Sequence, residues 1–336
     1  MDKLYPSAPQ EGWYQGKAGG GYILFHEGDY FHSKQLAVTY KHAENTWKEP
    51  LPEFQNNRLP KTIGKLTAGK SVRISLYGDS ISVGCNASGW LSVPPYMRPW
   101  SDLIVKNLRR YYKSTIYLSN ASSGGADSKW GADNTDSAVN SLLGNTTYDL
   151  AIIAFGMNDF ITPAEFKVNI KTIMDKIRAI SPDVEFMLIA TILPNPESYA
   201  MRYQAGFYTA LKELEGPGVV AVNMTGVHQE LLKHKKFRDR TANNINHPND
   251  FLSRWYAQFI SNMLIDPSAE LLPTPSPSPL PTPSVQAPSP TIGQTAEPAD
   301  HTNNLRSGTV LIIAGIVTLL SVAGFTLVLY LKKKQR

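Results

Sequence analysis

The sequence predicts an α/β fold with a five-stranded parallel sheet, and two observations lead to this prediction. Five short apolar runs typical of buried strands recur between residues 72 and 222, and stretches with helical periodicity separate them. Strands that alternate with helices form a parallel sheet covered on both faces. Ligands bind such sheets at the carboxyl ends of the strands, so polar residues at those ends are the first candidates for a site.

The elements follow one another along the chain. The strands are predicted at 72–77, 115–119, 150–155, 185–192 and 219–222. The helices are predicted at 100–112, 138–143, 163–180, 199–214 and 250–264. The first strand ends at Gly78, whose conformational freedom allows a sharp turn. The third helix begins at Thr162-Pro163, a cap followed by a proline in the first turn.

The regions outside this alternation have a different composition. Residues 21–47 read as two or three strands with turns, and 59–70 as a connector, so we expect a β-rich partial domain at 1–66 before an α/β domain at 67–266. Residues 267–308 form a Pro/Ser/Thr-rich spacer. Residues 309–331 carry no charge and predict a transmembrane helix, and the basic residues 332–336 predict a cytoplasmic tail. The start of the chain lacks an apolar leader, so we expect that the natural N-terminus, with the rest of the β domain, is missing.

Charge and cysteine content exclude some classes of partner. The formal net charge is +5, of which the last five residues carry +4, which leaves +1 on the rest. A basic tail is not a basic face, and no nucleic-acid-binding module is present, so no nucleic-acid partner is expected. Cys85 is the only cysteine and cannot form an intramolecular disulfide.

Polar stretches at the predicted strand ends contain the groups that acyl transfer needs. Such a site needs a nucleophile, a base and donors for the developing oxyanion. Ser80, in the turn after the first strand, is the candidate nucleophile, and His247, in a late loop, is the candidate base. The backbone N–H groups of Ser80 and Gly125 and the side-chain amide of Asn158 are the candidate oxyanion hole.

Each of these residues alone also has a purely structural interpretation. Asp79 and Ser80 are good helix-cap residues, Gly125 suits a turn, Asn158 can bond its own backbone, and His247 can lie on the surface. Their joint occurrence at successive strand ends favours the catalytic interpretation.

Four short blocks resemble the SGNH (GDSL-type) hydrolase family. They are GDSIS around Ser80, the glycine at Gly125, GMND around Asn158 and HPND from His247, within roughly residues 70–265. The resemblance implies a flavodoxin-like three-layer sandwich and ester hydrolysis through a serine acyl-enzyme, without metal or cofactor. The chain looks most like the carbohydrate-esterase branch, in which a β-sandwich often precedes the catalytic domain.

One position departs from the family pattern. The family usually has an aspartate three residues before the histidine, and this chain has Asn244 there. Asn244 is therefore a candidate orienting residue, without the full negative charge that stabilises a protonated imidazole. A backbone carbonyl, Asp250 or Asp239 could replace it.

The substrate expectation rests on aromatic residues near the predicted catalytic loops. Trp90, Trp100, Trp130 and Phe160 could stack on sugar rings, or pack in the core or the loops. We expect a surface-anchored serine esterase that removes small acyl groups, in the first place acetyl, from carbohydrate. Its catalytic domain would be extracellular, on a single-pass membrane anchor at a Gram-positive bacterial surface. The alternatives are a non-catalytic glycan-binding protein on the same fold and an O-acyltransferase.

Overall fold

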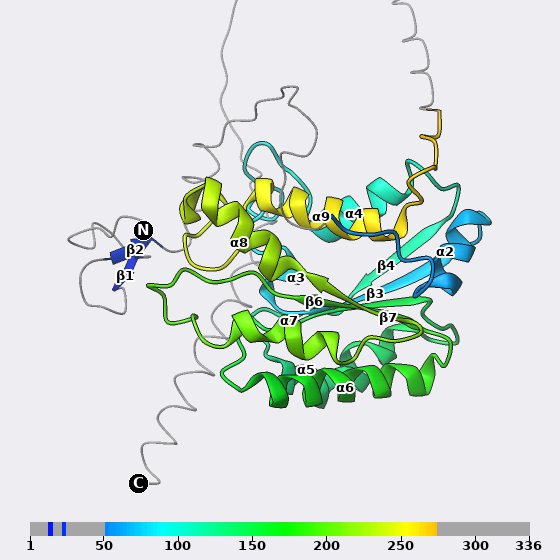
Figure 1. The fold of residues 1–336 in the computed structure, drawn as a ribbon, viewed down its shortest axis with the longest axis horizontal. Coiled ribbons are helices and arrows are strands. Elements are labelled where there is room, and N and C mark those ends of the chain that lie inside the picture. Colours follow the sequence, from blue (N-terminus) through cyan, green and yellow to red (C-terminus); the bar gives the residue numbers. More distant parts are fainter. Residues whose placement is uncertain (1–12, 16–21, 25–50, 274–336) are drawn as a thin grey trace, which may run out of the picture. The chain divides into compact units, whose positions relative to one another are not determined.

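The computed structural model describes residues 13–15, 22–24 and 51–273 (Figure 1). Residues 13–15 and 22–24 are two short antiparallel strands, β1 (Trp13–Gln15) and β2 (Tyr22–Leu24). Residues 51–273 contain a five-stranded sheet, parallel throughout, with the strand order β4-β3-β5-β6-β7. Its strands are β3 (Val72–Gly78), β4 (Ile116–Asn120), β5 (Leu150–Ala154), β6 (Glu185–Ala190) and β7 (Val219–Asn223). The predicted parallel sheet is confirmed, and all five predicted strands are present.

Eight α-helices lie between residues 51 and 273. They are α2 (Pro60–Thr67), α3 (Ser80–Val83), α4 (Trp100–Leu108), α5 (Ser128–Ala138), α6 (Pro163–Ile180), α7 (Gln204–Lys212), α8 (Met224–His234) and α9 (Asp250–Leu264). Two 3₁₀ turns are also present, η1 (Asn140–Leu142) and η2 (Phe237–Asp239). The prediction for α6 and α9 is confirmed at both ends, and α4 and α7 are shorter than predicted. The prediction missed α2, α3, α5 and α8, and the helix predicted at 138–143 is the end of α5 followed by η1.

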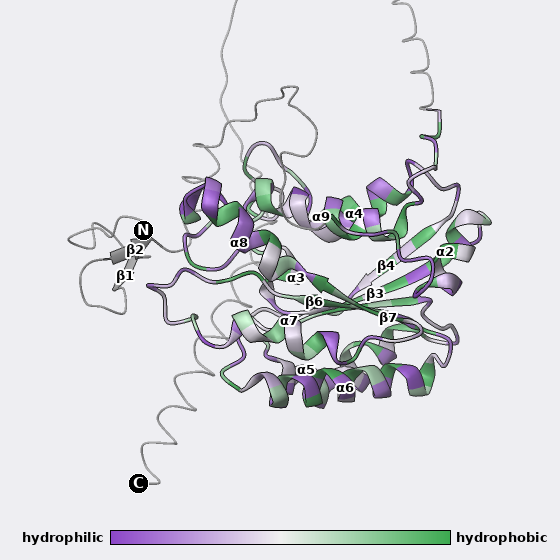
Figure 2. Ribbon diagram, viewed as in Figure 1, coloured by the Kyte–Doolittle hydropathy of each residue, from purple (hydrophilic) through white to green (hydrophobic). Residues whose placement is uncertain are grey.

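The helices form one layer on each face of the sheet (Figure 1). One core contains side chains of α2, α4, α8 and α9 with one set of strand residues, and the other contains those of α5, α6 and α7 with the alternate set. In β5, for example, Ile152 faces the first layer and Ile153 the second, because successive side chains of a strand point to opposite faces. Figure 2 shows the result, with largely hydrophobic strands between helices in which polar and apolar residues alternate.

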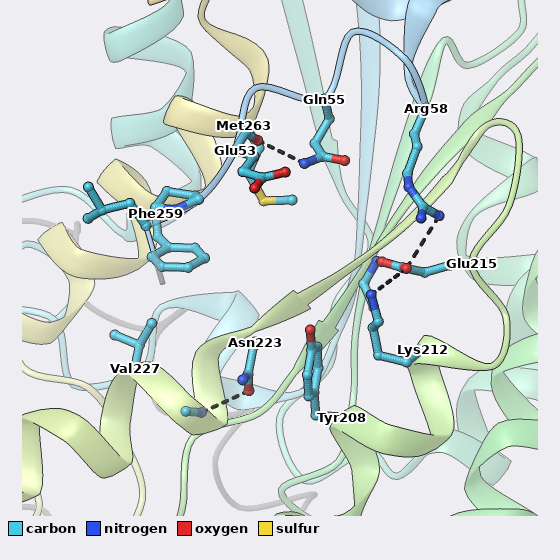
Figure 3. A pocket seen from close by; sticks show the side chains of 14 residues that line it. Glu53, Gln55, Arg58, Tyr208, Lys212, Glu215, Asn223, Val227, Phe259 and Met263 are labelled. Atoms are coloured by element: carbon cyan, nitrogen blue, oxygen red, sulfur yellow. Dashed lines mark hydrogen bonds and ion pairs between the residues drawn. The ribbon is translucent and has the colours of Figure 1, made fainter. Parts of the chain in front are cut away.

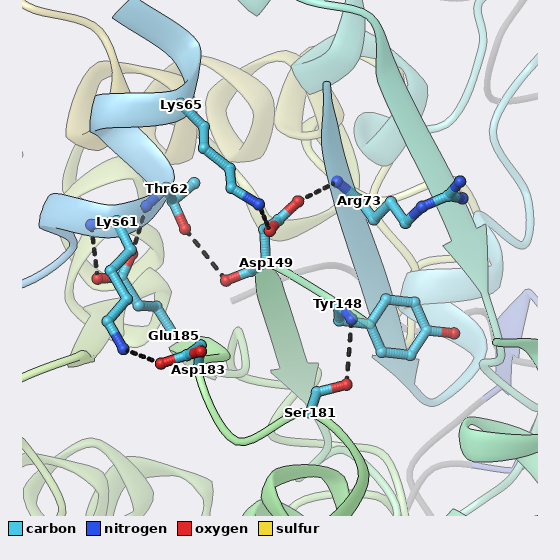
Figure 4. A network of polar contacts seen from close by, with 9 residues as sticks. All are labelled: Lys61, Thr62, Lys65, Arg73, Tyr148, Asp149, Ser181, Asp183 and Glu185. Carbon is cyan, nitrogen blue, oxygen red and sulfur yellow. Dashed lines mark hydrogen bonds and ion pairs between the residues drawn. The ribbon is translucent and has the colours of Figure 1, made fainter. Parts of the chain in front are cut away.

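A buried carboxylate anchors α2 to the sheet (Figure 4). The two oxygens of Glu185, at the start of β6, accept from the backbone N–H groups of Lys61 (2.9 Å) and Thr62 (2.8 Å) in the first turn of α2. The Thr62 hydroxyl donates to the carbonyl of Asp149, and Lys65 pairs with the Asp149 carboxylate at 2.5 Å. A negative group at a helix N-terminus satisfies N–H donors that have no partner within the helix.

The apolar side of α2 belongs to the same core as α4 and α9. Leu59, Ile63 and Leu66 are at most 2% exposed there. The predicted boundary between residues 66 and 67 therefore falls in the last turn of a helix that packs against the α/β sheet. The predicted connector at 59–70 is largely this helix.

Several predicted regions lie outside the described residues. They are most of the β-rich region at 1–66, most of the spacer at 267–308, the transmembrane segment at 309–331 and the tail at 332–336. Within the ranges 13–15, 22–24 and 51–273, no helix is both long and apolar enough to cross a membrane.

Candidate active site

The turn after β3 holds Ser80 at the carboxyl end of the sheet. Asp79 caps α3 by accepting from the Ile81 N–H at 2.9 Å, and Ser80 is the first residue of that helix. Gly78 has no room for a side chain, because an added Cβ would lie 2.3 Å from the Ala154 carbonyl oxygen of the neighbouring strand. The cap interpretation of Asp79 is therefore confirmed, and the same turn places Ser80 at the carboxyl end of β3.

The structure brings Ser80 and His247 together across 167 residues of sequence. The Ser80 Oγ lies 2.8 Å from Nε2 of His247, and the other ring nitrogen, Nδ1, lies 2.5 Å from Oδ1 of Asn86. An amide oxygen can only accept, so it fixes the proton of a neutral imidazole on Nδ1 and leaves Nε2 free to accept from the serine hydroxyl. This is the arrangement that a general base for Ser80 requires.

Asn244, the candidate orienting residue, does not make this contact. Its buried amide oxygen accepts no hydrogen bond from the described part of the chain, and its carbonyl accepts from the side chain of Asn195 at 2.9 Å. The backbone of Asn244 has a positive φ of 57°, a left-handed conformation that asparagine tolerates. The residue thus shapes the loop, and the imidazole is oriented by Asn86 instead.

The two other candidates, Asp250 and Asp239, have different environments. Asp250 accepts from the backbone N–H of Ser88 (3.0 Å) with one oxygen and from the Ser88 hydroxyl (2.7 Å) with the other. Asp239 is exposed, and its carbonyl accepts from Asn249 at 3.0 Å. The bond between Asp250 and Ser88 ties the start of α9 to the loop that carries Asn86, so Asp250 supports the orienting residue.

The loop that carries His247 is organised by Asn243. The buried amide oxygen of Asn243 accepts from the backbone N–H groups of Ile245, Asn246 and His247, at 3.0, 3.0 and 3.1 Å. The Ala242 N–H donates to the carbonyl of His247 at 2.9 Å and closes the loop. Asparagine side chains commonly hold turns in this way, and here the turn presents the imidazole.

The candidate oxyanion donors lie in loops that are bonded to one another. Asn158 Nδ2 donates to the carbonyl of Ala126, next to Gly125, at 2.9 Å. Gly125 has a φ of 77°, and nothing lies within 4 Å of the position of an added Cβ. The backbone N–H groups of Ser80 and Gly125 make no hydrogen bond within the described part of the chain. Both remain available to a ligand, as does the second N–H of Asn158.

Asp79 links the nucleophile turn to the loop of Asn158. Its second oxygen accepts from the Met157 N–H at 3.3 Å, and burial raises the pKa of the Asp79 carboxyl to about 7. Burial also raises the pKa of Asp159 to about 6, although both the backbone and the hydroxyl of Ser128 donate to it. Two carboxylates thus fix the loops behind the site, and within the described ranges no group of three or more potential metal ligands is present.

The four candidate aromatic residues have different environments. Trp90 and Phe160 are about half exposed, at 50% and 52%. Trp100 is a core residue whose indole donates to the Ile81 carbonyl at 2.9 Å, and Trp130 packs against Tyr77. Trp90 is therefore available to a sugar, and Trp130 is partly exposed. One face of the Phe160 ring is covered by the guanidinium of Arg202, 4.4 Å from the ring centroid, so only its other face is open.

A cavity of about 250 Å³ lies at the β7 edge of the sheet and is lined by residues of α7, α8 and α9 (Figure 3). The side chain of Glu215 pairs there with Arg58 (3.3 Å) and Lys212 (2.6 Å), and the Asn223 amide oxygen caps α8 through the Gly226 N–H. No predicted site residue lines this cavity. The charged groups of its lining neutralise one another. We therefore interpret this cavity as a packing gap between helices and the sheet edge, and not as a reaction site.

The sequence contained no local signal for Asn86 or Asn243. Asn86 lies 161 residues before His247, and an asparagine in a turn has many structural uses. Only the folded chain brings the side chain of Asn86 to the ring nitrogen.

Comparison with known proteins identifies a family for most of the α/β part of the chain. The model of the GDSL-like lipase/acylhydrolase family matches residues 76–252, which include all four blocks. No curated protein matches the chain.

Several solved structures are similar. A two-domain esterase active on acetylated mannans has 20% identity and a TM-score of 0.50, over 66% of this chain and 57% of that one. The same esterase co-crystallised with mannopentaose has 20% identity and a TM-score of 0.51, over 63% and 54%. An acetyl-xylooligosaccharide esterase from Geobacillus has 14% identity and a TM-score of 0.49, over 60% and 98%. The chain thus spans little more than half the length of the two-domain esterase. At this level of identity the similarity shows a shared fold and no more.

Proposed function

Because the chain belongs to the GDSL-like lipase/acylhydrolase family and is a carboxylic ester hydrolase, we propose that it removes small acyl groups, in the first place acetyl, from carbohydrate. The observation that carries the proposal is the 2.8 Å contact between the Ser80 hydroxyl and Nε2 of His247, together with the amide oxygen of Asn86 at the opposite ring nitrogen.

The proton movements follow from this contact. The Ser80 oxygen attacks the ester carbonyl carbon while its proton passes to Nε2 of His247. The imidazolium then returns the proton to the sugar oxygen, the carbon–oxygen bond to the sugar breaks, and the acyl group stays on Ser80. A water molecule gives its proton to Nε2, attacks the acyl carbon and releases the carboxylic acid, and Ser80 regains its proton.

The oxyanion that forms in both steps needs hydrogen-bond donors. The N–H groups of Ser80 and Gly125 make no hydrogen bond within residues 51–273, and Asn158 is held by the Ala126 carbonyl beside Gly125. These three groups are the proposed oxyanion hole. Donors fixed before the reaction stabilise the developing charge without reorganisation during the step.

Orientation of His247 by a neutral side chain should lower the turnover number. Asn86 fixes the tautomer of His247, as an aspartate would, but supplies no negative charge to the imidazolium that forms in the transition state. We therefore expect an active esterase with a turnover number below that of a Ser–His–Asp enzyme.

The preference for small acyl groups is supported by the access to the site. Only 7% of Ser80 and 8% of His247 is exposed, which favours a compact acyl group over a long chain. The exposed ring of Trp90 follows β3, whose carboxyl end carries Ser80, and aromatic faces stack on sugar rings. Phe160, after β5, has one face covered by Arg202 and offers only the other. The similarity in fold to an esterase active on acetylated mannans also supports a carbohydrate substrate.

The location proposed for this activity rests on the sequence beyond residue 266. An uncharged segment at 309–331 followed by a basic tail supports a single-pass anchor with the tail inside the cell. The Pro-rich spacer would then hold the catalytic part away from the membrane, at a Gram-positive bacterial surface.

The test is hydrolysis of p-nitrophenyl acetate and p-nitrophenyl palmitate by residues 1–266, beside Ser80→Ala. We expect turnover of the acetyl ester, little turnover of the palmitoyl ester, and loss of both in the folded variant. Acetate release from acetylated mannan or xylan tests the carbohydrate substrate. A long-chain preference would contradict the acyl specificity, and equal rates in Ser80→Ala would contradict the nucleophile. If an added sugar acceptor diverts the acetyl group from water, the enzyme is an acyltransferase.

A further inference from the structure

Five cationic side chains gather around α4, in the helical layer that α4 shares with α9 (Figure 1). A cavity of about 800 Å³ on one side of α4 is lined by Arg98, Lys106 and Arg109, and one of about 490 Å³ on the other side is lined by Lys106, Arg110 and Arg254. Among the described residues, Asp102 is the only acidic residue in either lining.

This face is more basic than the composition suggests. The chain carries a net charge of only +1 once its basic tail is set aside, yet five cations and one acid lie around α4. The sequence analysis expected no basic face, although four of the five cations lie between residues 98 and 110. The fifth, Arg254 of α9, joins them only in the folded chain. The fold therefore places Arg254 beside a basic segment of the sequence and creates a local positive potential.

The larger cavity extends to the catalytic end of the sheet. Its floor includes Ile116 and Leu118 of β4, and its lining ends at Asn120, the last residue of that strand. The side chain of Asn120 donates to the carbonyl of Ser82 at 2.9 Å, in the short helix that begins with Ser80. A ligand in this cavity would thus lie beside the helix that carries the nucleophile.

The cations of the larger cavity are available to a ligand. Within the described ranges Arg98 pairs only with Asp102, at 3.3 Å, and both side chains are solvent-exposed, so this pair is readily exchanged. Lys106 forms no ion pair with the described part of the chain. One nitrogen of Arg109 donates to the Ile116 carbonyl at 2.9 Å, which holds the guanidinium against β4 and leaves its other donors free.

We propose that this cavity binds the carboxylate- or phosphate-bearing backbone of an acidic polysaccharide whose acyl group lies at Ser80. This inference rests on the proposed function and specifies its substrate class. The apolar floor and the exposed Tyr96 offer surface to sugar rings, and Arg98, Lys106 and Arg109 offer charge to the anions. The volume is far larger than one acetyl group requires, so it suits several linked sugars.

The shape of the face favours a polymer over an anionic membrane. The cations line grooves on both sides of a helix, where a narrow chain can follow them, whereas a lipid surface meets only protruding groups. One groove also leads towards the nucleophile, which a docking surface for lipid would not need to do.

The test compares the chain of residues 1–336, in non-ionic detergent, with a double variant, Arg98→Gln with Lys106→Gln. The substrates are O-acetylated polygalacturonate and O-acetylated glucomannan of equal acetyl content, beside p-nitrophenyl acetate. We expect kcat/KM for the acidic polymer, relative to that for p-nitrophenyl acetate, to fall about tenfold in the double variant, and salt to reduce this difference. The ratio for glucomannan should change little.

The matched control is Lys129→Gln with Lys171→Gln, on the opposite helical layer. Each of these lysines forms an exposed ion pair with an aspartate four residues later, as Arg98 does with Asp102. The control therefore removes the same charge as the double variant and one ion pair more, because Lys106 forms none with the described part of the chain. We expect no change in the ratio for this variant.

Binding measured without turnover separates this inference from the proposed function. Calorimetry with unacetylated decagalacturonate should detect binding to the wild type that is weakened in the double variant and retained in the control. Equal binding by all three proteins, or none by the wild type, would overturn the inference even if p-nitrophenyl acetate is hydrolysed. Binding to phosphatidylglycerol vesicles that the double variant loses, with polymer kinetics unchanged, would assign the face to a membrane instead.

Discussion

Oδ1 of Asn86 lies 2.5 Å from Nδ1 of His247, in the position where a serine hydrolase usually places a carboxylate. The residue has a φ of 64°, so the loop after α3 must adopt a left-handed conformation to bring the amide to the ring. The base is therefore oriented by a neutral group from the nucleophile's own loop, and not by a residue near the histidine in sequence.

This contact predicts opposite effects for two substitutions of Asn86. Asn86→Gly keeps the left-handed backbone and removes the acceptor, so we expect kcat to fall by about 100-fold, within the range found for loss of general-base function. Asn86→Asp adds a negative charge that favours the protonated imidazole, so we expect a higher kcat and an acidic limb of the pH–rate profile at higher pH. Steady-state kinetics from pH 5 to 9 on p-nitrophenyl acetate measure both effects.

Asn244→Asp is the matched control for Asn86→Asp. It introduces the same charge into the same site, at a residue that also has a positive φ but whose amide oxygen makes no hydrogen bond to the imidazole. We expect a much smaller change in kcat. A larger gain at Asn244 than at Asn86 would show that the catalytic loop is arranged differently during turnover.

The proposed oxyanion hole predicts a selective loss for Asn158→Ala. One donor of such a hole contributes about 10²- to 10³-fold to kcat, and we expect a loss in this range with KM little altered. The Ala126 carbonyl also loses its partner, so thermal unfolding must be measured in parallel. A change confined to KM would assign Asn158 to substrate binding instead.

Substitution by alanine should have opposite effects on the stability of the protein at Gly78 and at Gly64. A Cβ at Gly78 would lie 2.3 Å from the Ala154 carbonyl oxygen and 2.6 Å from Ser82 Oγ, so the strand or the nucleophile turn must shift. We expect Gly78→Ala to lower the free energy of unfolding by about 3 kcal/mol or more and to impair activity. At Gly64, in α2, nothing lies within 4 Å, and Gly64→Ala should stabilise the protein by about 0.5–1 kcal/mol. Urea unfolding of both variants checks this, and equal effects would contradict the packing argument.

The buried carboxyl of Asp79 predicts that stability falls as pH rises. Its pKa is raised from 3.8 to about 7 by burial, so between these values the native state keeps a proton that the unfolded state releases. The free energy of unfolding therefore falls as pH rises through this window. Below the window Asp79 is protonated in both the native and the unfolded state. Urea unfolding at pH 5, 6, 7 and 8 should show a shallower pH dependence for Asp79→Asn than for the wild type. Parallel curves would mean that Asp79 is ionised at low pH in the native state.

The packing of α2 predicts where the catalytic part begins. A chain shortened to start at residue 51 keeps Leu59, Ile63 and Leu66 in the core and the partners of Glu185 in place, so it should remain folded. A chain that starts at residue 67 exposes that part of the core and leaves the Glu185 carboxylate without its two backbone donors. We expect it to be insoluble or to unfold many degrees earlier in a thermal melt, and equal melting temperatures would contradict this.

Local sequence patterns were sufficient to predict helix α6 and the five strands of the sheet. Helix α6 begins as predicted because Thr162 and Glu165 form a capping box with a proline in the first turn, and the five strands are apolar runs bounded by turns. Helices α5 and α8 were missed, since the polar sequence of α5 resembles a loop and α8 follows β7 without an intervening turn. Helix α2 has little local signal beyond its apolar spacing, and its anchor, Glu185, is more than 120 residues away.

By itself the sequence determined the parallel α/β fold, the family blocks and the identity of the candidate nucleophile and base, because these depend on periodicity and on short motifs. Only the tertiary structure decided that Asn86 orients His247, that Asn244 shapes its loop, that Trp100 is a core residue, and that five cations meet around α4. The physical reason is that each feature depends on a distant segment. Asn86 is 161 residues from His247, Asn195 holds Asn244, and Arg254 joins the basic residues at 98–110. Their partners are set by how helices pack on the sheet, and no local propensity encodes that arrangement.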